Sequence, residues 1–132
     1  MDTLLLSLVA AERTLRVAHV AALKPHGLTP EEWRALDAVE RNVGMAIGEL
    51  ARVAAFNLPA LSKLADRLAE RGLLRRRRHE EDTRRVLIHM TPPGARLVSE
   101  ARPAIEAAER DVGRRLGQWD MDRLVRLLKA LA

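Results

Sequence analysis

The sequence contains no cysteine, and this absence removes several kinds of chemistry. Without cysteine the chain forms no disulfides, no thiolate zinc sites and no thiol-based redox sensor. The four histidines (His19, His26, His79 and His89) do not show metal-ligand spacing, so we expect no metal and no cofactor. No serine–histidine–aspartate arrangement, carboxylate pair or glycine-rich phosphate loop occurs in a suitable context. The chain is therefore not expected to be an enzyme.

Aromatic residues and long apolar runs are also scarce. The 132 residues include one phenylalanine, two tryptophans and no tyrosine, so leucine, alanine and valine must fill the core. That composition favours packed helices over a sheet sandwich, which is enriched in aromatic and β-branched residues. No segment reaches the roughly 18 apolar residues that a membrane span requires. The leucine-rich residues 1–11 lack a basic n-region and are interpreted as a helix, not a signal peptide. We expect a single cytoplasmic domain, residues 1–132, that does not bind membranes.

Positive charge is concentrated in one part of the chain. Residues 57–91 carry nine lysines and arginines and five acidic residues, a surplus of four out of the total net charge of +5. A basic surface suggests a polyanionic partner, such as nucleic acid or an anionic membrane surface. The run of four arginines at 75–78, taken alone, fits a solvated face equally well.

Helix signals cover both ends of the chain and its first half. Apolar spacing predicts a helix over 3–23, which Pro25 and Gly27 end. Thr29 and Glu32 form a capping box for a second helix, which runs to about Asn42 and buries Trp33 and Leu36. Further helices are predicted over residues 46–53, 58–71, 91–115 and 120–132, the last capped by Asp120.

Two short strands are predicted between the fourth and fifth helices. Residues 73–77 and 85–90 bracket a polar loop, and 86–90 is the only segment rich in β-branched residues. A short helix, a tight connection at 54–57, a second helix and a hairpin together make a winged helix-turn-helix, whose second helix enters the DNA major groove. The predicted fold class is mainly α with a small β-hairpin wing: a winged helix-turn-helix lobe (29–94) flanked by N- and C-terminal dimerisation helices (1–28 and 95–132). The recognition helix is about 58–71 and the wing about 73–90.

The recognition helix has one apolar face and one polar face. Leu61, Leu64, Ala65 and Leu68 follow helical spacing and are expected to be buried. The DNA-binding candidates on the other face are Asn57, Pro59, Ala60, Ser62, Lys63 and Arg67. Small or hydrogen-bonding residues allow close approach to base edges, and Lys63 and Arg67 would lie near phosphates.

These central residues resemble the MarR family of bacterial regulators. The resemblance is carried by Glu49-Leu50-Ala51, residues 61–68, Gly72-Leu73-Leu74 with Arg76, Asp82-Thr83-Arg84, and residues 86–91 followed by Gly94. It covers the central half of the chain well, whereas the flanking helices match only in length and placement. The chain departs from the family pattern at Ala46, where a serine or threonine cap is usual, so the first motif helix should start loosely. The wing has Arg77 and Arg78 where the family has a proline.

The resemblance implies a triangular homodimer whose terminal helices interlock and whose wings reach adjacent minor grooves. Arg84 then matches the arginine that enters the minor groove, oriented by Asp82, and a narrow groove concentrates the negative potential that attracts it. The other reading is a surface pair of Asp82 and Arg84, worth little energy. The remaining wing candidates for DNA contact are Arg76, Arg77, Arg78 and Arg85.

Leucines crowd both chain ends. The dimer-interface candidates are Leu4, Leu5, Leu8, Leu124, Leu127, Leu128 and Leu131. These side chains either pack within one chain or build a two-fold interface, and a dimer would read two half-sites about one helical turn apart.

The family often binds small, frequently anionic aromatic ligands between the dimer helices and the DNA-binding lobe. The candidates for such a pocket are Arg13, Arg16, His19, His26 and Trp33. Trp33 fits a core position better, and His19 a helix surface.

The sequence thus predicts a sequence-specific transcriptional regulator, a repressor that binds double-stranded DNA as a homodimer at a pseudo-palindromic operator and is released by a small aromatic or anionic effector. The alternative is a winged-helix module for protein–protein contact or for non-specific, architectural DNA binding.

Overall fold

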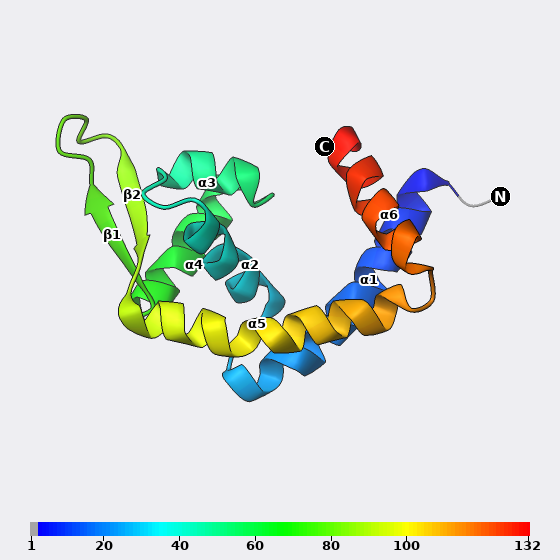
Figure 1. Cartoon of the computed structure of the whole chain (residues 1–132). Helices are drawn as coiled ribbons and strands as arrows, with labels where there is room; N and C mark the ends of the chain where they lie inside the picture. Colours follow the sequence, from blue (N-terminus) through cyan, green and yellow to red (C-terminus); the bar gives the residue numbers. More distant parts are fainter. Residues whose placement is uncertain (1–2) are drawn as a thin grey trace.

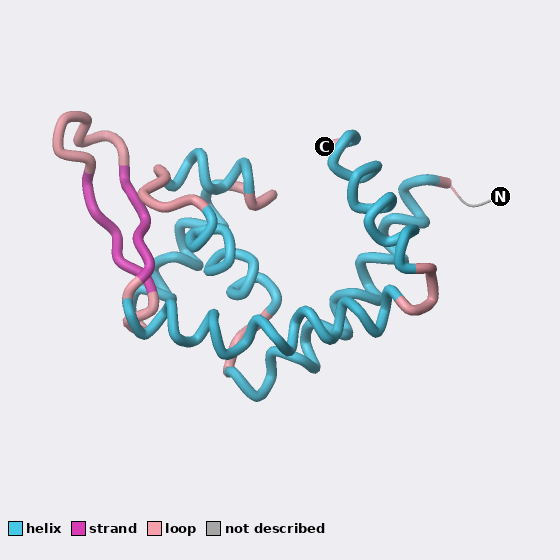
Figure 2. The backbone as a smooth tube through the Cα atoms, viewed as in Figure 1, coloured by secondary structure: helices cyan, strands magenta, loops and turns pink. Residues whose placement is uncertain are grey.

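Helices form most of the chain. The computed structural model describes residues 3–132, without the side chain of Gln118. In chain order the elements are α1 (Leu4–Leu23), the 3-10 turn η1 (Lys24–His26), α2 (Pro30–Arg41), α3 (Ile47–Val53), α4 (Leu58–Glu70), β1 (Leu74–Arg78), β2 (Val86–Met90), α5 (Pro92–Gly113) and α6 (Gln118–Leu131). Both strands lie together at one end of the molecule (Figure 2). The predicted fold class, mainly α with one small hairpin, is confirmed.

The elements gather in two groups joined by α5 (Figure 1). At one end lie α2, α3, α4 and the hairpin, which we call the winged lobe. At the other lie α1 and α6 with the second half of α5, which we call the terminal lobe. Helix α5 begins beside the hairpin, passes below α2 and packs along α1. Within residues 3–132, no helix combines the length and the apolar character needed to cross a bilayer.

Local capping explains where the helices of the winged lobe begin. The Thr29 hydroxyl accepts from the Glu32 amide, while the Glu32 carboxylate accepts from the Thr29 amide, so the predicted capping box is present. The Asn57 side chain accepts from the Ala60 amide at 2.8 Å and caps α4. Ala46 makes no side-chain cap for α3, as the sequence predicted.

The hairpin starts one residue later than predicted. β1 and β2 pair antiparallel from Leu74 opposite Met90 to Arg78 opposite Val86. Leu73 is not in the strand because its amide donates to the Leu68 carbonyl, which closes the end of α4 after Gly72 at a φ of 74°. The helix-ending turn therefore takes the residue that the sequence pattern assigned to the strand.

A close backbone approach joins the base of the wing to α5. The Thr91 hydroxyl donates to the Gly72 carbonyl at 2.6 Å and accepts from the Gly94 amide at 3.1 Å. A Cβ at position 94 would lie 2.1 Å from the Leu73 carbonyl oxygen, so only glycine fits there. Gly94, which follows Thr91-Pro92-Pro93, is therefore required for the close packing of α5 against the base of the wing.

The core lies in the winged lobe and against the first half of α5. The fully buried large side chains are Leu23, Leu36, Leu50, Leu61, Leu68, Ile88 and Val98. Trp33 and Val39 are buried beside them. Helix α1 contributes only its last residue, Leu23, and α6 contributes no buried residue among those described.

Two sequence predictions about the last helices are wrong. Helix α6 begins at Gln118 after Gly117, so Asp120 lies in the first turn and is not the cap. Helix α5 ends at Gly113, two residues earlier than expected.

Candidate nucleic-acid interface

Helix α4 presents a polar face to solvent beside the hairpin. Its apolar face is buried as predicted, through Leu61, Leu64, Ala65 and Leu68. The predicted contact residues Asn57, Pro59, Ala60, Lys63 and Arg67 are all exposed, as are Leu58 and Asp66. The predicted contact residues are small, polar or basic, a composition that permits close approach to a polyanion.

Ser62 and Arg76, both predicted to contact DNA, contact each other in the structure. The Arg76 guanidinium forms an ion pair with Asp66 and donates to the Ser62 hydroxyl at 3.2 Å. Arg76 and Ser62 are only half-exposed, and the cluster connects β1 to α4. Sequence reasoning missed Asp66. The alternation of side chains along β1 could have predicted that Arg76 faces the protein. Arg76 lies two residues after the buried Leu74 and therefore lies on the same face of the strand.

The wing carries several exposed arginines, two of which pair with acidic residues of the wing: Arg77 with Glu80 and Arg84 with Asp82. Arg75, Arg77, Arg78 and Arg84 are exposed, and the Arg84 side chain is 90% exposed. The Asp82 carboxylate accepts from both the backbone amide and Nε of Arg84, each at 3.2 Å. Asp82 and Arg84 thus form a pair, which fits both an oriented Arg84 and a simple surface pair.

Two further contacts order the wing. The His79 ring nitrogen Nδ1 accepts from the backbone amides of Glu81 and Asp82 at 3.2 and 3.0 Å, a role that sequence reasoning missed. Arg85 donates to Glu49 on α3 at 2.9 Å. Of the predicted wing arginines, Arg85 is therefore engaged with the helix-turn-helix, whereas Arg84 points into solvent.

Comparison with known proteins agrees with this geometry. The family model described as "MarR family" matches residues 26–85, which hold α2, α3, α4, β1 and the wing loop. The chain is thus similar to the MarR family. The relatives and solved structures that it matches are named as transcriptional regulators.

Two curated relatives illustrate this similarity. A transcriptional regulatory protein for the hcr operon of Thauera aromatica is 30% identical over 105 residues, which are 80% of this chain and 63% of that protein. The chain thus spans less than two thirds of the Thauera aromatica protein. The homoprotocatechuate degradative operon repressor of Escherichia coli is 27% identical over 128 residues, 97% of this chain and 86% of the repressor.

Two solved structures match nearly the whole chain. The transcriptional regulator PA4135 superposes with a TM-score of 0.91 at 26% identity, covering 99% of this chain and 96% of PA4135. NadR in complex with 4-hydroxyphenylacetate superposes with a TM-score of 0.86 at 25% identity, covering 99% of this chain and 93% of NadR. The winged-helix fold with long terminal helices is therefore shared.

A hollow of about 270 Å³ lies between α1 and α2, and we call it the interlobe hollow. Three of the five predicted pocket residues line it, namely Arg16, His19 and Trp33. Arg13 and His26 do not line it, because Arg13 is on another side of α1 and His26 lies in η1. The sequence did not predict the other α2 residues of the lining, chiefly Glu31, Arg34 and Asp37. Across residues 3–132, no three histidine, aspartate or glutamate side chains converge as metal ligands would.

Ion pairs occupy much of the interlobe hollow. Arg16 donates to Glu12 at 2.8 Å and also pairs with Glu31 across the two helices. The hydrogen bond from Arg16 lowers the pKa of Glu31, and the hydrogen bond to Glu31 in turn raises the pKa of Arg16. Both groups are therefore charged near neutral pH. His19 lies with Nε2 3.1 Å from a Glu109 oxygen on α5.

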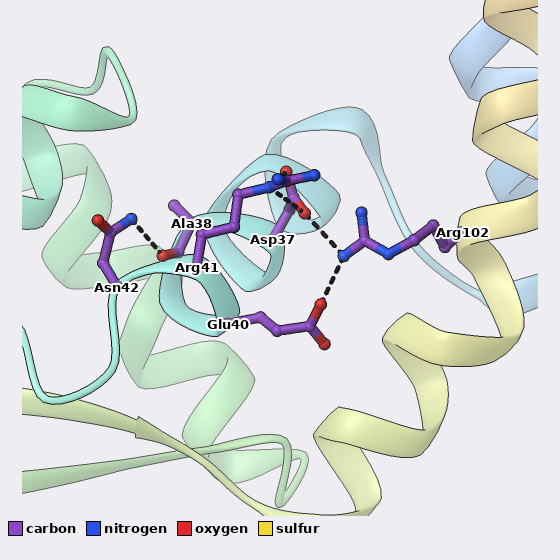
Figure 3. A network of polar contacts seen from close by, with 6 residues as sticks. All are labelled: Asp37, Ala38, Glu40, Arg41, Asn42 and Arg102. Atoms are coloured by element: carbon purple, nitrogen blue, oxygen red, sulfur yellow. Dashed lines mark hydrogen bonds and ion pairs between the residues drawn. The ribbon is translucent and has the colours of Figure 1, made fainter.

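A second network connects α5 to α2 (Figure 3). Arg102 on α5 donates to Asp37 at 2.8 Å and to Glu40 at 2.6 Å, and the Asp37 hydrogen bond raises the pKa of Arg102. Arg41 donates to the same Asp37 carboxylate at 3.1 Å. The Arg102 guanidinium also lies 5.2 Å from the centroid of the Trp33 ring. This network fixes the angle between the lobes from the side of α5.

The terminal lobe exposes apolar side chains. The candidate interface leucines Leu4, Leu5, Leu124, Leu127, Leu128 and Leu131 are all exposed, and Leu8 is half-exposed. They do not pack into the core of the single chain. Between α5 and α6 lies a hollow of about 690 Å³ whose apolar lining includes Leu116, Met121 and Val125. It is larger than the interlobe hollow but lies far from the helix-turn-helix (Figure 1).

Proposed function

We propose that this chain is a MarR-family repressor that binds a pseudo-palindromic operator as a homodimer and is released by a small aromatic carboxylate. The observation that carries the proposal is the pairing of two exposed surfaces on one rigid lobe. The polar face of α4 is open to solvent beside a hairpin that projects Arg84 from an Asp82 support. The major groove admits an α-helix, and a narrow minor groove attracts an inserted arginine.

The homodimer is supported by the exposed leucines of the terminal lobe. A single chain leaves them in water, at an unfavourable free energy that grows with the apolar area exposed. A contiguous apolar patch on a small protein marks an interaction site. A two-fold pairing through α1 and α6 would bury the leucines and place two copies of α4 on successive turns of one DNA face.

The effector class is supported by the interlobe hollow. It lies between the lobes, it has the indole of Trp33 in its lining, and its volume suits a molecule with one ring. The related NadR structure holds 4-hydroxyphenylacetate, a hydroxylated aromatic carboxylate. The Escherichia coli relative is named as the repressor of an operon for degrading another such compound. We therefore propose aromatic carboxylates for this chain as well.

The test is selection of bound duplexes from a random DNA pool by the purified full chain. The proposal expects enrichment of a pseudo-palindrome whose half-sites lie about one helical turn apart. Binding without enrichment would support architectural DNA binding instead, and no binding at low salt would support a protein-contact module. A selected duplex that is released by an aromatic carboxylate, and retained with the matching amide, would establish the effector class.

A further inference from the structure

The wing tip, residues 79–85, is folded around the side chain of His79. The Nδ1 atom of the imidazole accepts from the Glu81 amide at 3.2 Å and from the Asp82 amide at 3.0 Å. The backbone amide of His79 donates to the Arg85 carbonyl at 2.9 Å, which closes the hairpin below the tip. His79 is half-exposed and directly follows the last residue of β1. It therefore ties the start of the tip to both its middle and its end.

The hydrogen bonds of the tip continue to Arg84. Asp82, whose amide donates to His79, accepts from the backbone amide and from Nε of Arg84, each at 3.2 Å. The Asp82 carbonyl also accepts from the Arg85 amide at 3.0 Å. His79, Asp82 and Arg84 thus form one chain of hydrogen bonds, and the side chain at its end, that of Arg84, is 90% exposed. The placement of the Asp82 carboxylate, and with it of Arg84, depends on the acceptor that His79 supplies.

Only one form of the imidazole can make these bonds. Nδ1 accepts when the ring is neutral and its proton is on Nε2, and a ring with both protons has no acceptor. The charged groups around the tip are the acidic residues 80–82, Arg84, Arg77 of β1, which pairs with Glu80, and Arg85, which pairs with Glu49 of α3. Carboxylates and guanidiniums ordinarily keep their charge between about pH 5.5 and pH 8, whereas histidine changes charge there.

We propose that His79 is a positioning residue of the wing, whose neutral Nδ1 holds the tip in the conformation that presents Arg84 to DNA. The inference rests on the proposed function only for its output, DNA affinity. With the acceptor in place, the Asp82 carboxylate is fixed and Arg84 is already ordered before DNA binds. Without it the tip gains freedom, and ordering Arg84 at the moment of binding lowers the affinity. Acidification therefore weakens DNA binding, because protonation of the ring removes the acceptor.

The first test uses the full chain without DNA. Long-range nitrogen-15 NMR spectra distinguish the two neutral tautomers of an imidazole from the charged ring. At about pH 8, His79 should be the Nε2–H tautomer, and a proton on Nδ1 would overturn the proposal. Between about pH 8 and pH 5.5, the protection factors of the Glu81 and Asp82 amides against hydrogen exchange should fall about fivefold. Unchanged protection factors would exclude the role of His79 in the tip.

Asparagine and glutamine form a matched pair of substitutions. Oδ1 of asparagine takes the place of Nδ1, and asparagine readily bonds to a backbone amide two residues on. Glutamine carries its amide one bond further out. His79→Asn should therefore keep the tip amides protected at both pH values, whereas His79→Gln should leave them unprotected at both. Equal protection in the two variants would contradict a requirement for an acceptor at this position.

The control histidine is His89, which lies in the same hairpin on β2, opposite Arg75 and outside the tip. His89→Gln should change neither the protection of the tip amides nor its dependence on pH. If His89→Gln abolished that pH dependence, the titrating group would be His89, and His79 would not be the positioning residue. Circular dichroism melting establishes that each variant is folded.

DNA affinity measures the positioning role itself. For a duplex selected from the random pool, at fixed salt and about pH 8, His79→Gln should raise the Kd about threefold, while His79→Asn stays near the parent value. At about pH 5.5, the parent should bind more weakly than His79→Asn by a similar factor. If acidification instead strengthens the parent relative to His79→Asn, the charged ring acts as a phosphate contact and the positioning role is refuted.

The route through Arg84 is tested by a double-mutant cycle. In an Arg84→Ala background, His79→Gln should change DNA affinity little further, because both substitutions remove the same contact. Additive losses would refute the route from His79 to Arg84. If no duplex is selected, the proposed function fails, while the tautomer and the amide protection still decide whether His79 orders the tip.

Discussion

The winged lobe and the terminal lobe differ in where their apolar side chains lie. In the winged lobe, apolar residues from three helices and a strand meet in one core with α5, and Leu36, Leu61 and Leu68 are fully buried. In the terminal lobe, leucines of the same size on α1 and α6 are exposed, and Leu127 is 57% exposed. The winged lobe is therefore stabilised within one chain, whereas the terminal lobe has an apolar surface that only further contacts can bury.

The largest expected effect is a truncation inside the winged-lobe core. Leu61→Ala removes a side chain that is 1% exposed and should lower the free energy of unfolding by about 3 kcal/mol, because a cavity remains. Urea denaturation followed by circular dichroism measures this change. Leu5→Ala, at an exposed position of α1, is the comparison. If Leu5→Ala lowered the free energy of unfolding by a similar amount at low protein concentration, the proposed difference between the lobes would be wrong.

The next effect concerns the terminal lobe. Leu127→Glu places a charge on the apolar surface of α6 and should raise the dimer dissociation constant roughly a hundredfold, because burying an unpaired carboxylate is unfavourable. Sedimentation at several concentrations measures the change. Val43→Glu is the control, since Val43 is an exposed apolar residue of the winged lobe. A chain that sediments as a monomer before any substitution would contradict the proposed homodimer.

A smaller effect separates two neighbouring wing arginines. Arg84→Ala should weaken binding to a selected duplex by about 1 kcal/mol or more, because a minor-groove arginine sits in concentrated negative potential. Arg85→Ala should weaken it less, because Arg85 already pairs with Glu49 on α3. Fluorescence anisotropy at fixed salt measures both affinities. Equal losses would mean that the wing acts only through its total charge.

Salt dependence distinguishes a DNA contact from a positioning contact on α4. Lys63→Ala should reduce the slope of log K against log salt by about 0.9, because one phosphate contact is lost. Arg76→Ala should weaken affinity with a smaller change in slope, since Arg76 is bound to Asp66 and Ser62. In a double-mutant cycle, the Asp66→Ala and Arg76→Ala losses should be less than additive. Additive losses would instead assign Arg76 to the DNA backbone.

The smallest effect concerns the ion pair between the lobes. Because Arg16 lowers the pKa of Glu31 in the folded chain, this pair stabilises the fold above the ordinary glutamate pKa of 4.5. That stability is lost as the pH falls through the lowered pKa. In the Glu31→Gln variant, the free energy of unfolding should therefore fall slightly less between about pH 7 and pH 3 than in the parent protein. Urea denaturation at several pH values measures this difference. Glu12 is the other carboxylate that pairs with Arg16, and Glu12→Gln should change this pH dependence less.

Local patterns account for what the sequence predicted well. The capping box at Thr29, the Asn57 cap and the buried face of α4 each depend on residues within seven positions of one another. Such patterns survive any tertiary arrangement, so they could be predicted before it was known. The wrong start of the last helix also comes from a local pattern. Asp120 is an acceptable cap by its residue type, but the helix begins earlier, after Gly117.

The contacts that distinguish this protein join residues far apart in the sequence. Ser62 and Arg76, Arg34 and Phe56, and Arg16 and Glu31 meet only because the helices and the wing cross at particular angles. Sequence reasoning assigned Arg16 to a pocket correctly but missed Arg34, since no local pattern shows which side of α2 faces α1.

The sequence by itself determined the order of helices, the winged helix-turn-helix and the sign of its charge, because hydrophobic period, capping and composition act over short distances. Only the tertiary structure decided which arginines are free and which are already bound, because a charged side chain takes whichever partner the packing of distant elements places within reach. Arg84 pairs with Asp82 inside the wing, whereas Arg76, Arg85 and Arg102 pair with acidic residues of other elements.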